Sequence, residues 1–351
     1  MKECHEMLIQ ALMEHVENYP EKAEEILEKA KDKDFLSKVT DDIADEIKGT
    51  IISYVSDELV ERRKENTKFL ENNYRKWDDG FDSLESLILI CIDAGNTCNK
   101  MYGAEFVKQK DFLFGTIVRL HARACHIANE ILCLLKSGYA DGAHARWRAL
   151  HEVAVTSSFI TANGQECAKR YLDHDVIESY KGMLQQKKFE SRLNAEGPTQ
   201  GEIDSCKKVY DEIVAEYGKE FKGQYGWASK FVSKKGRVNF ADIEQSVGSD
   251  HFRPYYKWAS QNIHAGPKAL RNQLGMCESE KDVLLVGPSD SGMTDPASST
   301  ALSLVNITTN LLLIKPTLDH IAIMKILAEL AENVGDIFFK IDFPELDKNM
   351  N

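Results

Sequence analysis

The stretch Ser137-Gly-Tyr-Ala-Asp-Gly-Ala-His-Ala-Arg-Trp-Arg-Ala-Leu-His-Glu152 joins two segments whose apolar residues recur at helical spacing. The segment before it, residues 110–136, repeats apolar side chains every three or four positions and is the strongest predicted helix of the chain. Ser137-Gly138 ends this helix, and a second one is predicted over 140–162, up to Asn163-Gly164. A connection this short brings the two helices together as an antiparallel hairpin, around which the rest of the fold is predicted to form.

The second helix of this hairpin carries charged residues among alanines and a leucine. His144, Arg148, His151 and Glu152 follow one another at helical spacing, so they share one helix face. Charged groups are costly to bury unless they are paired or used. Arg148 and Glu152 can pair as i and i+4, and Arg123 of the first helix could take Glu152 across the hairpin. The face is therefore predicted to hold a functional site or a salt-bridged structural network.

The composition is that of an ordinary globular protein with an acidic N-terminal part. The chain has 351 residues, of which 43% are hydrophobic and 28% charged, and its formal net charge is -12. Residues 1–80 contain 13 Lys and Arg against 21 Asp and Glu. Such a field argues against broad binding of duplex DNA, although it leaves room for a small basic cleft. No signal peptide and no membrane-length apolar run are found, which predicts a cytoplasmic protein without membrane contact.

Neither a metal nor a cofactor is predicted. The eight cysteines include no Cys-x-x-Cys pair, so a zinc site is not expected. Cys91, Cys125 and Cys133 lie in apolar helical runs, which is typical of reduced thiols in a core. Gly287-Pro-Ser-Asp-Ser-Gly292 lacks the Gly-Lys-Ser/Thr of a phosphate-binding loop. The chemistry of any site is therefore expected to come from side chains alone.

Residues 1–80 are predicted to form an acidic helical N-terminal region, and residues 81–351 a helical core domain. Helices are predicted over about 2–17, 20–31, 34–40 and 41–76, and Asp78-Asp-Gly80 is expected to break the last of them. Along this last helix an apolar residue recurs every four positions, which makes a narrow stripe: Ile43, Ile47, Ile51, Val55 and Leu59. Such a helix is either a solvated arm or a surface that packs against a partner protein.

The remainder is predicted to be all-α, a multi-helix bundle built round the hairpin. The only strand candidate is Val283-Leu-Leu-Val286, so at most one small β-hairpin is expected. Strands do not alternate with helices, which disfavours an α/β fold. Beyond the hairpin, helices are predicted over about 81–101, 166–191, 199–222, 251–264, 296–314 and 317–338.

Several of these segments resemble the bacterial domain-of-unknown-function 5677 family. The resemblance lies in residues 119–135, in the stretch from Ser137 to Val155 with its Arg-Trp-Arg-x-Leu-His-Glu core, and in Ser260-Gln-Asn-Ile-His-Ala-Gly266. Shorter similarities follow at Leu285-Val-Gly-Pro-Ser289 and Asp295-Pro-Ala297. The family implies an all-helical fold and supplies no activity.

A more distant resemblance is to HEPN helical bundles, some of which are metal-independent ribonucleases. Arg146-x4-His151 has the Arg-x4–6-His spacing of those enzymes, although five positions on one helix separate the two side chains by about 140°. In that family an arginine stabilises the scissile phosphate, and a histidine moves the proton of the ribose 2′-hydroxyl. The second helix of the HEPN pattern corresponds to Ser260-Gln-Asn262-Ile-His264, and it lacks the arginine expected before the asparagine.

Two hypotheses follow for the function. In the first, the chain is a HEPN-like endoribonuclease that acts on RNA as a toxin or phage-defence effector. Arg146 or Arg148 would hold phosphate, His264 or His151 would move the proton, and Glu152 would orient an arginine. The candidates for contacting substrate are Ser260, Asn262, Arg123 and Trp147.

In the second hypothesis, the chain is a non-catalytic helical sensor or protein-interaction module. Its buried Arg–Glu–His network would fix the helices or bind a small anion, and its acidic N-terminal arm would meet a partner protein. A homo-oligomer is expected under either hypothesis. The aromatic segment with His251, Tyr255, Tyr256 and Trp258 is open to two interpretations, stacking on a base or packing in the core.

Overall fold

The computed structural model describes residues 33–344 except 235, 265, 269, 272 and 279–283, and for residues 33–40, 42, 43 and 46 it describes the backbone alone. The chain divides into two compact units, Met1–Glu71 and Asn72–Asn351. The helices predicted at 2–17 and 20–31 lie outside the described residues. Within the described part the fold is all-α, as predicted, and no strand occurs there.

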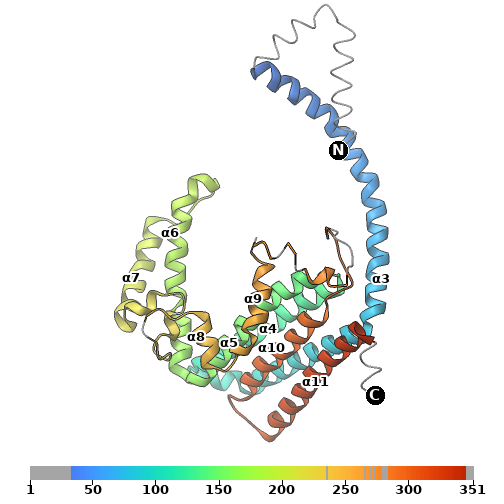
Figure 1. Ribbon diagram of the computed structural model, residues 1–351. Coiled ribbons are helices and arrows are strands. Elements are labelled where there is room, and N and C mark those ends of the chain that lie inside the picture. Colours follow the sequence, from blue (N-terminus) through green and yellow to red (C-terminus); the bar gives the residue numbers. More distant parts are fainter. Residues whose placement is uncertain are drawn as a thin grey trace, which may run out of the picture. The chain divides into compact units, whose positions relative to one another are not determined.

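The first helix, α3, runs without interruption over Lys33–Gln109 (Figure 1). The predicted break at Asp78-Asp-Gly80 is wrong. Gly80 lies against the ring of Phe338, where a Cβ atom would come within 3.0 Å of the ring carbons. The glycine therefore lets another helix pack closely against α3, and it does not end the helix. Trp77 and Phe81 contact the same ring, with centroids at 5.5 and 6.0 Å.

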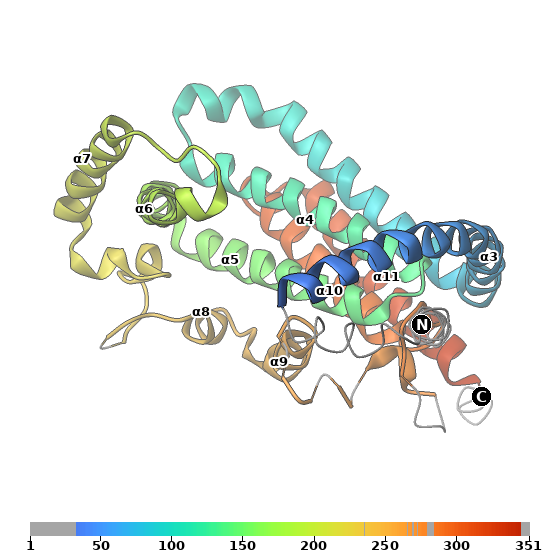
Figure 2. The ribbon, with the colours of Figure 1, turned by 90° about the horizontal axis from the view of Figure 1, so that it is seen from above.

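The core of the second unit is a bundle of long helices. The part of α3 from Asn72 onward packs with four others, α4 (Phe112–Lys136), α5 (Ala140–Asp173), α10 (Thr294–Leu312) and α11 (Leu318–Asp342). The helices α4, α5, α10 and α11 lie side by side, as Figures 1 and 2 show. The predicted antiparallel hairpin is formed by α4 and α5 and is confirmed.

The ends of this hairpin follow from local chemistry. Asp111 caps α4 by accepting a hydrogen bond from the backbone N–H of Phe114. Gly138 has φ 81°, a left-handed conformation that favours glycine, and it turns the chain into α5. The end predicted at Asn163-Gly164 is a bend, because Gly164 adopts φ 72° and ψ -157° while the helix continues to Asp173.

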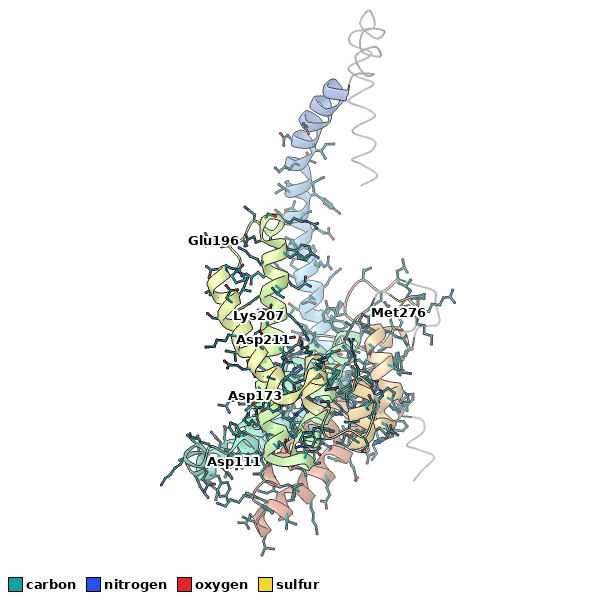
Figure 3. The ribbon with its side chains drawn as sticks, turned by 90° about the vertical axis from the view of Figure 1, so that its left-hand side faces the viewer. Asp111, Asp173, Glu196, Lys207, Asp211 and Met276 are labelled. Atoms are coloured by element: carbon teal, nitrogen blue, oxygen red, sulfur yellow. The ribbon has the colours of Figure 1, made fainter. Side chains whose placement is uncertain are left out.

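A second helical hairpin, α6 (Asp175–Leu193) and α7 (Gln200–Tyr217), follows α5. Glu196 lies in its connecting turn, and Lys207 and Asp211 pair on α7 (Figure 3). Each of the two helices buries a single residue fully, Ile177 in α6 and Ile203 in α7. These two helices therefore pack mainly against each other.

Several short helices follow α7 in the chain, and some of them pack against α5. They are α8 (Phe240–Ser246), α9 (Arg253–Gln261) and 3₁₀ turns at Lys219–Lys222, Gly226–Ala228, Asp250–Phe252 and Leu274–Met276. Both α8 and α9 contact α5. Residues 284–286 of the strand candidate form no strand, and Val283 lies outside the described residues. No helix in the described part of the chain is long and apolar enough to cross a bilayer.

Candidate functional site

Arg148 and Glu152 of α5 point toward α9, where both meet Tyr256. The Tyr256 hydroxyl donates to Glu152 Oε1 at 2.6 Å and accepts from Arg148 Nη2 at 2.7 Å. The same guanidinium nitrogen lies 3.0 Å from Glu152 Oε1, and the guanidinium carbon lies 4.8 Å from the centre of the Tyr256 ring. Burial and the neighbouring Glu152 carboxylate raise the pKa of Tyr256. The predicted pairing of Arg148 with Glu152 is thus confirmed, and Tyr256 joins it.

His151 lies one turn from Arg148 on the same face of α5 and meets α8. Its Nε2 lies 2.8 Å from Oε1 of Glu244, which is fully buried. Arg253, the first residue of α9, forms an ion pair with the other oxygen of the same carboxylate. Burial, assisted by the positive charge of Arg253, lowers the pKa of His151 to about 4. The neutral imidazole therefore donates its Nε2–H to Glu244, because an ionised carboxylate can only accept.

Together these six side chains form what we call the α5 network: Arg148, His151, Glu152, Glu244, Arg253 and Tyr256. Two guanidinium groups face two carboxylates, so the α5 network is neutral when His151 is neutral. A buried set of charges is tolerated when it is paired in this way. The network fastens α8 and α9 to α5, and it leaves neither arginine without a carboxylate partner.

Arg146 lies outside the α5 network, on another side of α5. Its guanidinium pairs with Glu130 of α4 at 2.5 Å, and His126 Nε2 lies 3.5 Å from the other oxygen of that carboxylate. His151 meets Glu244 on α8 instead. The two residues of the Arg-x4-His pattern therefore engage different helices, as their angular separation on α5 implies, and the structure does not bring them together.

His264 and Asn262 lie just beyond the end of α9, at a second place. Together with Asp141, Gly142, Gln261 and Gln273 they line an open pocket of about 350 Å³. His264 is exposed, whereas Asn262 Nδ2 donates to the backbone carbonyl of Asp141 at 3.3 Å. The lining includes none of Arg146, Arg148 and Glu152. Seven residues of α5 separate Asp141 from Arg148, a rise of about 10 Å, so the predicted catalytic residues do not share this pocket.

Three of the predicted substrate contacts have other surroundings. Trp147 is fully buried and donates its indole N–H to the Ser299 carbonyl oxygen at 2.9 Å, which makes it a core residue. Ser260 donates its hydroxyl to the Tyr256 carbonyl at 2.7 Å, one turn back along α9. Arg123 is exposed, and the bridge expected between Arg123 and Glu152 is absent among the described side chains, because Arg148 and Tyr256 occupy that carboxylate.

The aromatic side chains of α9 divide between core and surface. Tyr256 is buried and Trp258 packs against the core, in agreement with the packing interpretation. Tyr255 is 43% exposed. Trp258 also meets the ring of His144 edge-on at 5.5 Å, and Trp147 stacks on that ring at 5.5 Å. The tryptophans therefore enclose a buried histidine.

Cysteines and acidic residues give no metal site in the described part of the chain. Cys91 and Cys125 are buried as predicted, but Cys133 is exposed, so its assignment to the core is wrong. Its side chain lies on the exposed side of α4, although the sequence around it is apolar. No group of three or more His, Cys, Asp and Glu side chains among the described residues is arranged as metal ligands.

Glu152→Ala is expected to lower the free energy of unfolding by about 1–2 kcal/mol. The change leaves Tyr256 without its acceptor and Arg148 without its carboxylate, which typically costs about 1.5–3 kcal/mol; solvent reduces this value because the Glu152 side chain is 35% exposed. Denaturant unfolding measures the effect. Glu178→Ala, which removes an exposed partner of Lys181, is the matched control and is expected to change stability by less than about 0.5 kcal/mol. Equal stabilities of the two variants would contradict the role given to Glu152.

Glu244 and Arg253 were not among the candidates from the sequence. A signal for Glu244 exists in hindsight, since Phe240, Ile243 and Glu244 are spaced three and four apart on one face of α8 and all three are buried. A glutamate on the apolar face of a short helix indicates a buried partner. For Arg253 the sequence offers no comparable signal.

One part of the chain matches a known protein family. Residues 115–282 match the sequence model of a family of unknown function, DUF5677. The match spans nearly all of the α4–α5 hairpin, α8 and α9, hence every residue of the α5 network, and it ends before the similarities noted at 285–289 and 295–297. No curated protein and no solved structure matches the chain. The region that holds the α5 network, just under half of the chain, is similar to the DUF5677 family, in agreement with the resemblance predicted from the sequence.

Proposed function

We propose that this chain is a non-catalytic helical interaction protein, in which the α5 network is structural. The observation that carries the proposal is the closed charge pairing of Arg148 and Arg253 with Glu152 and Glu244. The metal-independent, HEPN-like ribonuclease considered above needs a positive group free to hold phosphate and a histidine that exchanges protons near neutral pH. Within the α5 network the guanidinium groups are neutralised, and the pKa of His151 is lowered to about 4.

The surface for such an interaction lies on α3. We define the α3 stripe as Ile47, Ile51, Ile52, Tyr54, Val55 and Leu59. Five of its six residues are between 42% and 63% exposed, and Ile47 is partly buried. A contiguous exposed apolar patch of this kind typically marks a protein-binding surface. We therefore assign the predicted partner-binding role of the N-terminal region to the α3 stripe.

A second candidate function, the HEPN-like ribonuclease, is favoured by a different observation. His264 is exposed and shares an open pocket with Asn262. In this candidate His264 moves the proton, and Arg146 or Arg148 holds the phosphate after leaving its carboxylate partner. An RNA-cleaving toxin or defence effector in the cytoplasm would be the consequence.

The two candidates predict opposite results in one assay. The purified chain is incubated with total RNA in EDTA, and the proposed function predicts intact RNA. The ribonuclease candidate predicts cleavage that falls by about 10²–10⁴-fold in His264→Ala, and falls similarly in Arg146→Ala. His251→Ala, which removes another exposed histidine, is the matched control. Cleavage by the wild type that is lost in His264→Ala and kept in His251→Ala would overturn the proposed function.

A further inference from the structure

We infer that the α3 stripe is the pairing surface for a second copy of this chain, in an antiparallel arrangement. The inference rests on the proposed function in one respect, that α3 is the interaction surface.

Apolar residues of the α3 stripe lie on one side of α3. At about 100° per residue, the stripe covers about half of the helix circumference. Ile52 and Tyr54 at its edges are 57% and 63% exposed. Val60 points to the opposite side of the helix. An amphipathic helix normally buries its apolar face, and the α3 stripe meets no such cover among the described side chains.

A second feature of the stripe is its symmetry along the helix. A twofold axis beside Ser53 places Ile47 of one copy opposite Leu59 of the other, and Ile51 opposite Val55. Each apolar residue then meets an apolar residue, so the stripe is complementary to itself, as a twofold interface requires. The apolar contact covers positions 47–59, just under two heptads, and the charged residues on either side of it extend the paired length to 41–65.

A third feature is the charge at the two ends of the stripe, which decides the direction. Residues 41–46, before most of the stripe, contain four acidic and no basic side chains, including Asp41 and Asp45, whereas residues 61–65, after it, contain three basic side chains, including Arg62 and Arg63, and two acidic ones. Parallel pairing would set each acidic pair against its own copy, and each basic pair likewise. Antiparallel pairing about Ser53 brings the acidic end of one copy within about one helical turn of the basic end of the other. Opposite charges at flanking positions select the orientation of helix pairs in this way.

Two further charges agree with this register. Lys48 of one copy lies opposite Glu58 of the other when the twofold axis passes beside Ser53. Lys64 pairs within its own helix with Glu61, at 2.7 Å, and so needs no partner from the second copy. The same register sets Asp45 and Asp41 level with Glu61 and Glu65, so the antiparallel direction is favoured by the overall charge of the two ends and not by every facing pair.

The first test measures the mass of the full chain in solution. Sedimentation at several concentrations is expected to show a dimer, twice the 39.7 kDa monomer mass. The double change Ile51→Asp with Val55→Asp is expected to weaken dimerisation by at least about a hundredfold. Val60→Asp places the same charge on the opposite side of α3 and is expected to leave dimerisation unchanged. Circular dichroism of each variant checks that the helices remain folded.

The second test addresses the direction of pairing. Arg62→Glu with Arg63→Glu, and separately Asp41→Lys with Asp45→Lys, are each expected to weaken the homodimer by about tenfold to a hundredfold. A mixture of these two double variants is expected to form a heterodimer of wild-type strength, because the opposite charges again face each other. In a parallel pair neither double variant alone would be weakened, since like charges would merely change sign.

A chain that stays monomeric at all concentrations overturns the inference, whether the stripe is covered by another protein or by nothing. A dimer that survives the double change Ile51→Asp with Val55→Asp overturns the inference as well. So does a mixture of the two charge variants that forms no heterodimer. These failures are distinct from failure of the proposed function, which is decided by RNA cleavage in EDTA. A dimeric ribonuclease would keep the inference and remove the proposed function, and an inactive monomer would do the reverse.

Discussion

Glu244→Ala is expected to lower the free energy of unfolding by about 3–5 kcal/mol, the range for removing one partner of a buried ion pair. The carboxylate of Glu244 is fully buried and serves both His151 and Arg253. Its removal leaves the guanidinium group of Arg253, a side chain 24% exposed, without a counter-charge. It also leaves the Nε2–H of His151 without an acceptor. Since a domain is stable by about 5–15 kcal/mol in total, the variant is expected to lose much of its stability.

Denaturant unfolding of wild type and variants measures this loss. Glu244→Gln keeps an oxygen that can accept from His151 but lacks the negative charge, so an intermediate loss is expected. Glu216→Ala removes a carboxylate that is 57% exposed and 3.4 Å from Lys169, and it is expected to change stability by less than about 0.5 kcal/mol. If Glu244→Ala were as stable as Glu216→Ala, the α5 network could not be what holds α8 and α9 on α5.

The fold was predictable wherever apolar periodicity is strong and local. The α4–α5 hairpin follows from the repeat over 110–136 and from Ser137-Gly138, which acts within a few residues. Gly80 is a position where the local sequence predicted the wrong structure. In the sequence Asp78-Asp-Gly80 has the composition of a helix end, and the reason that α3 continues is Phe338, which is distant in the chain. Tertiary packing overrides local preference at such positions.

Only the α5 residues of the candidate site were predictable from the sequence. The spacing of Arg148, His151 and Glu152 fixed their common face, because helical geometry depends on neighbouring residues alone. Their partners, Tyr256 and Glu244, come from short helices about a hundred residues later, and sequence spacing says nothing about such contacts. Arg146 was grouped with His151 by a motif, although the angle between them already placed them on different sides of α5.

Two buried histidines outside the α5 network are expected to make the fold less stable in mild acid. Burial lowers the pKa of His144 to about 4 and that of His121 to about 4. Both ring nitrogens of His144 lack a hydrogen-bond partner among the described residues, and the ring lies between Trp147 and Trp258. His121 has one polar neighbour other than sulfur, the Thr308 hydroxyl at 3.1 Å. Among the described side chains, neither ring has a carboxylate partner that would stabilise the protonated form.

The sign of the effect follows from proton binding. In the unfolded chain each histidine has the ordinary pKa of about 6.5, so below that pH the unfolded state binds protons that the folded state does not. The stabilisation by each neutral, buried ring is complete above about pH 6.5 and declines as the pH falls toward 4. With about 1.4 kcal/mol for each unit of pKa difference, each ring contributes a loss of about 3 kcal/mol at pH 4. The two together are expected to remove about 6 kcal/mol, enough to unfold a typical domain.

Denaturant unfolding between about pH 7 and about pH 4.5 checks this prediction. His144→Phe keeps an aromatic ring between Trp147 and Trp258 but cannot take up a proton, so about 3 kcal/mol of the loss at pH 4 should disappear. The variant should also be at least as stable as wild type near neutral pH, since it removes two buried nitrogens that have no partner. An unchanged slope of stability against pH in His144→Phe would show that the imidazole is not the group that senses acid. The slope should fall again in a variant that also replaces His121, because the two rings lie in separate contacts, His121 with Thr308 of α10 and His144 with Trp258 of α9, and separate sites contribute additively to stability. The slope that remains is expected to come from His151 and His174, whose pKa burial also lowers.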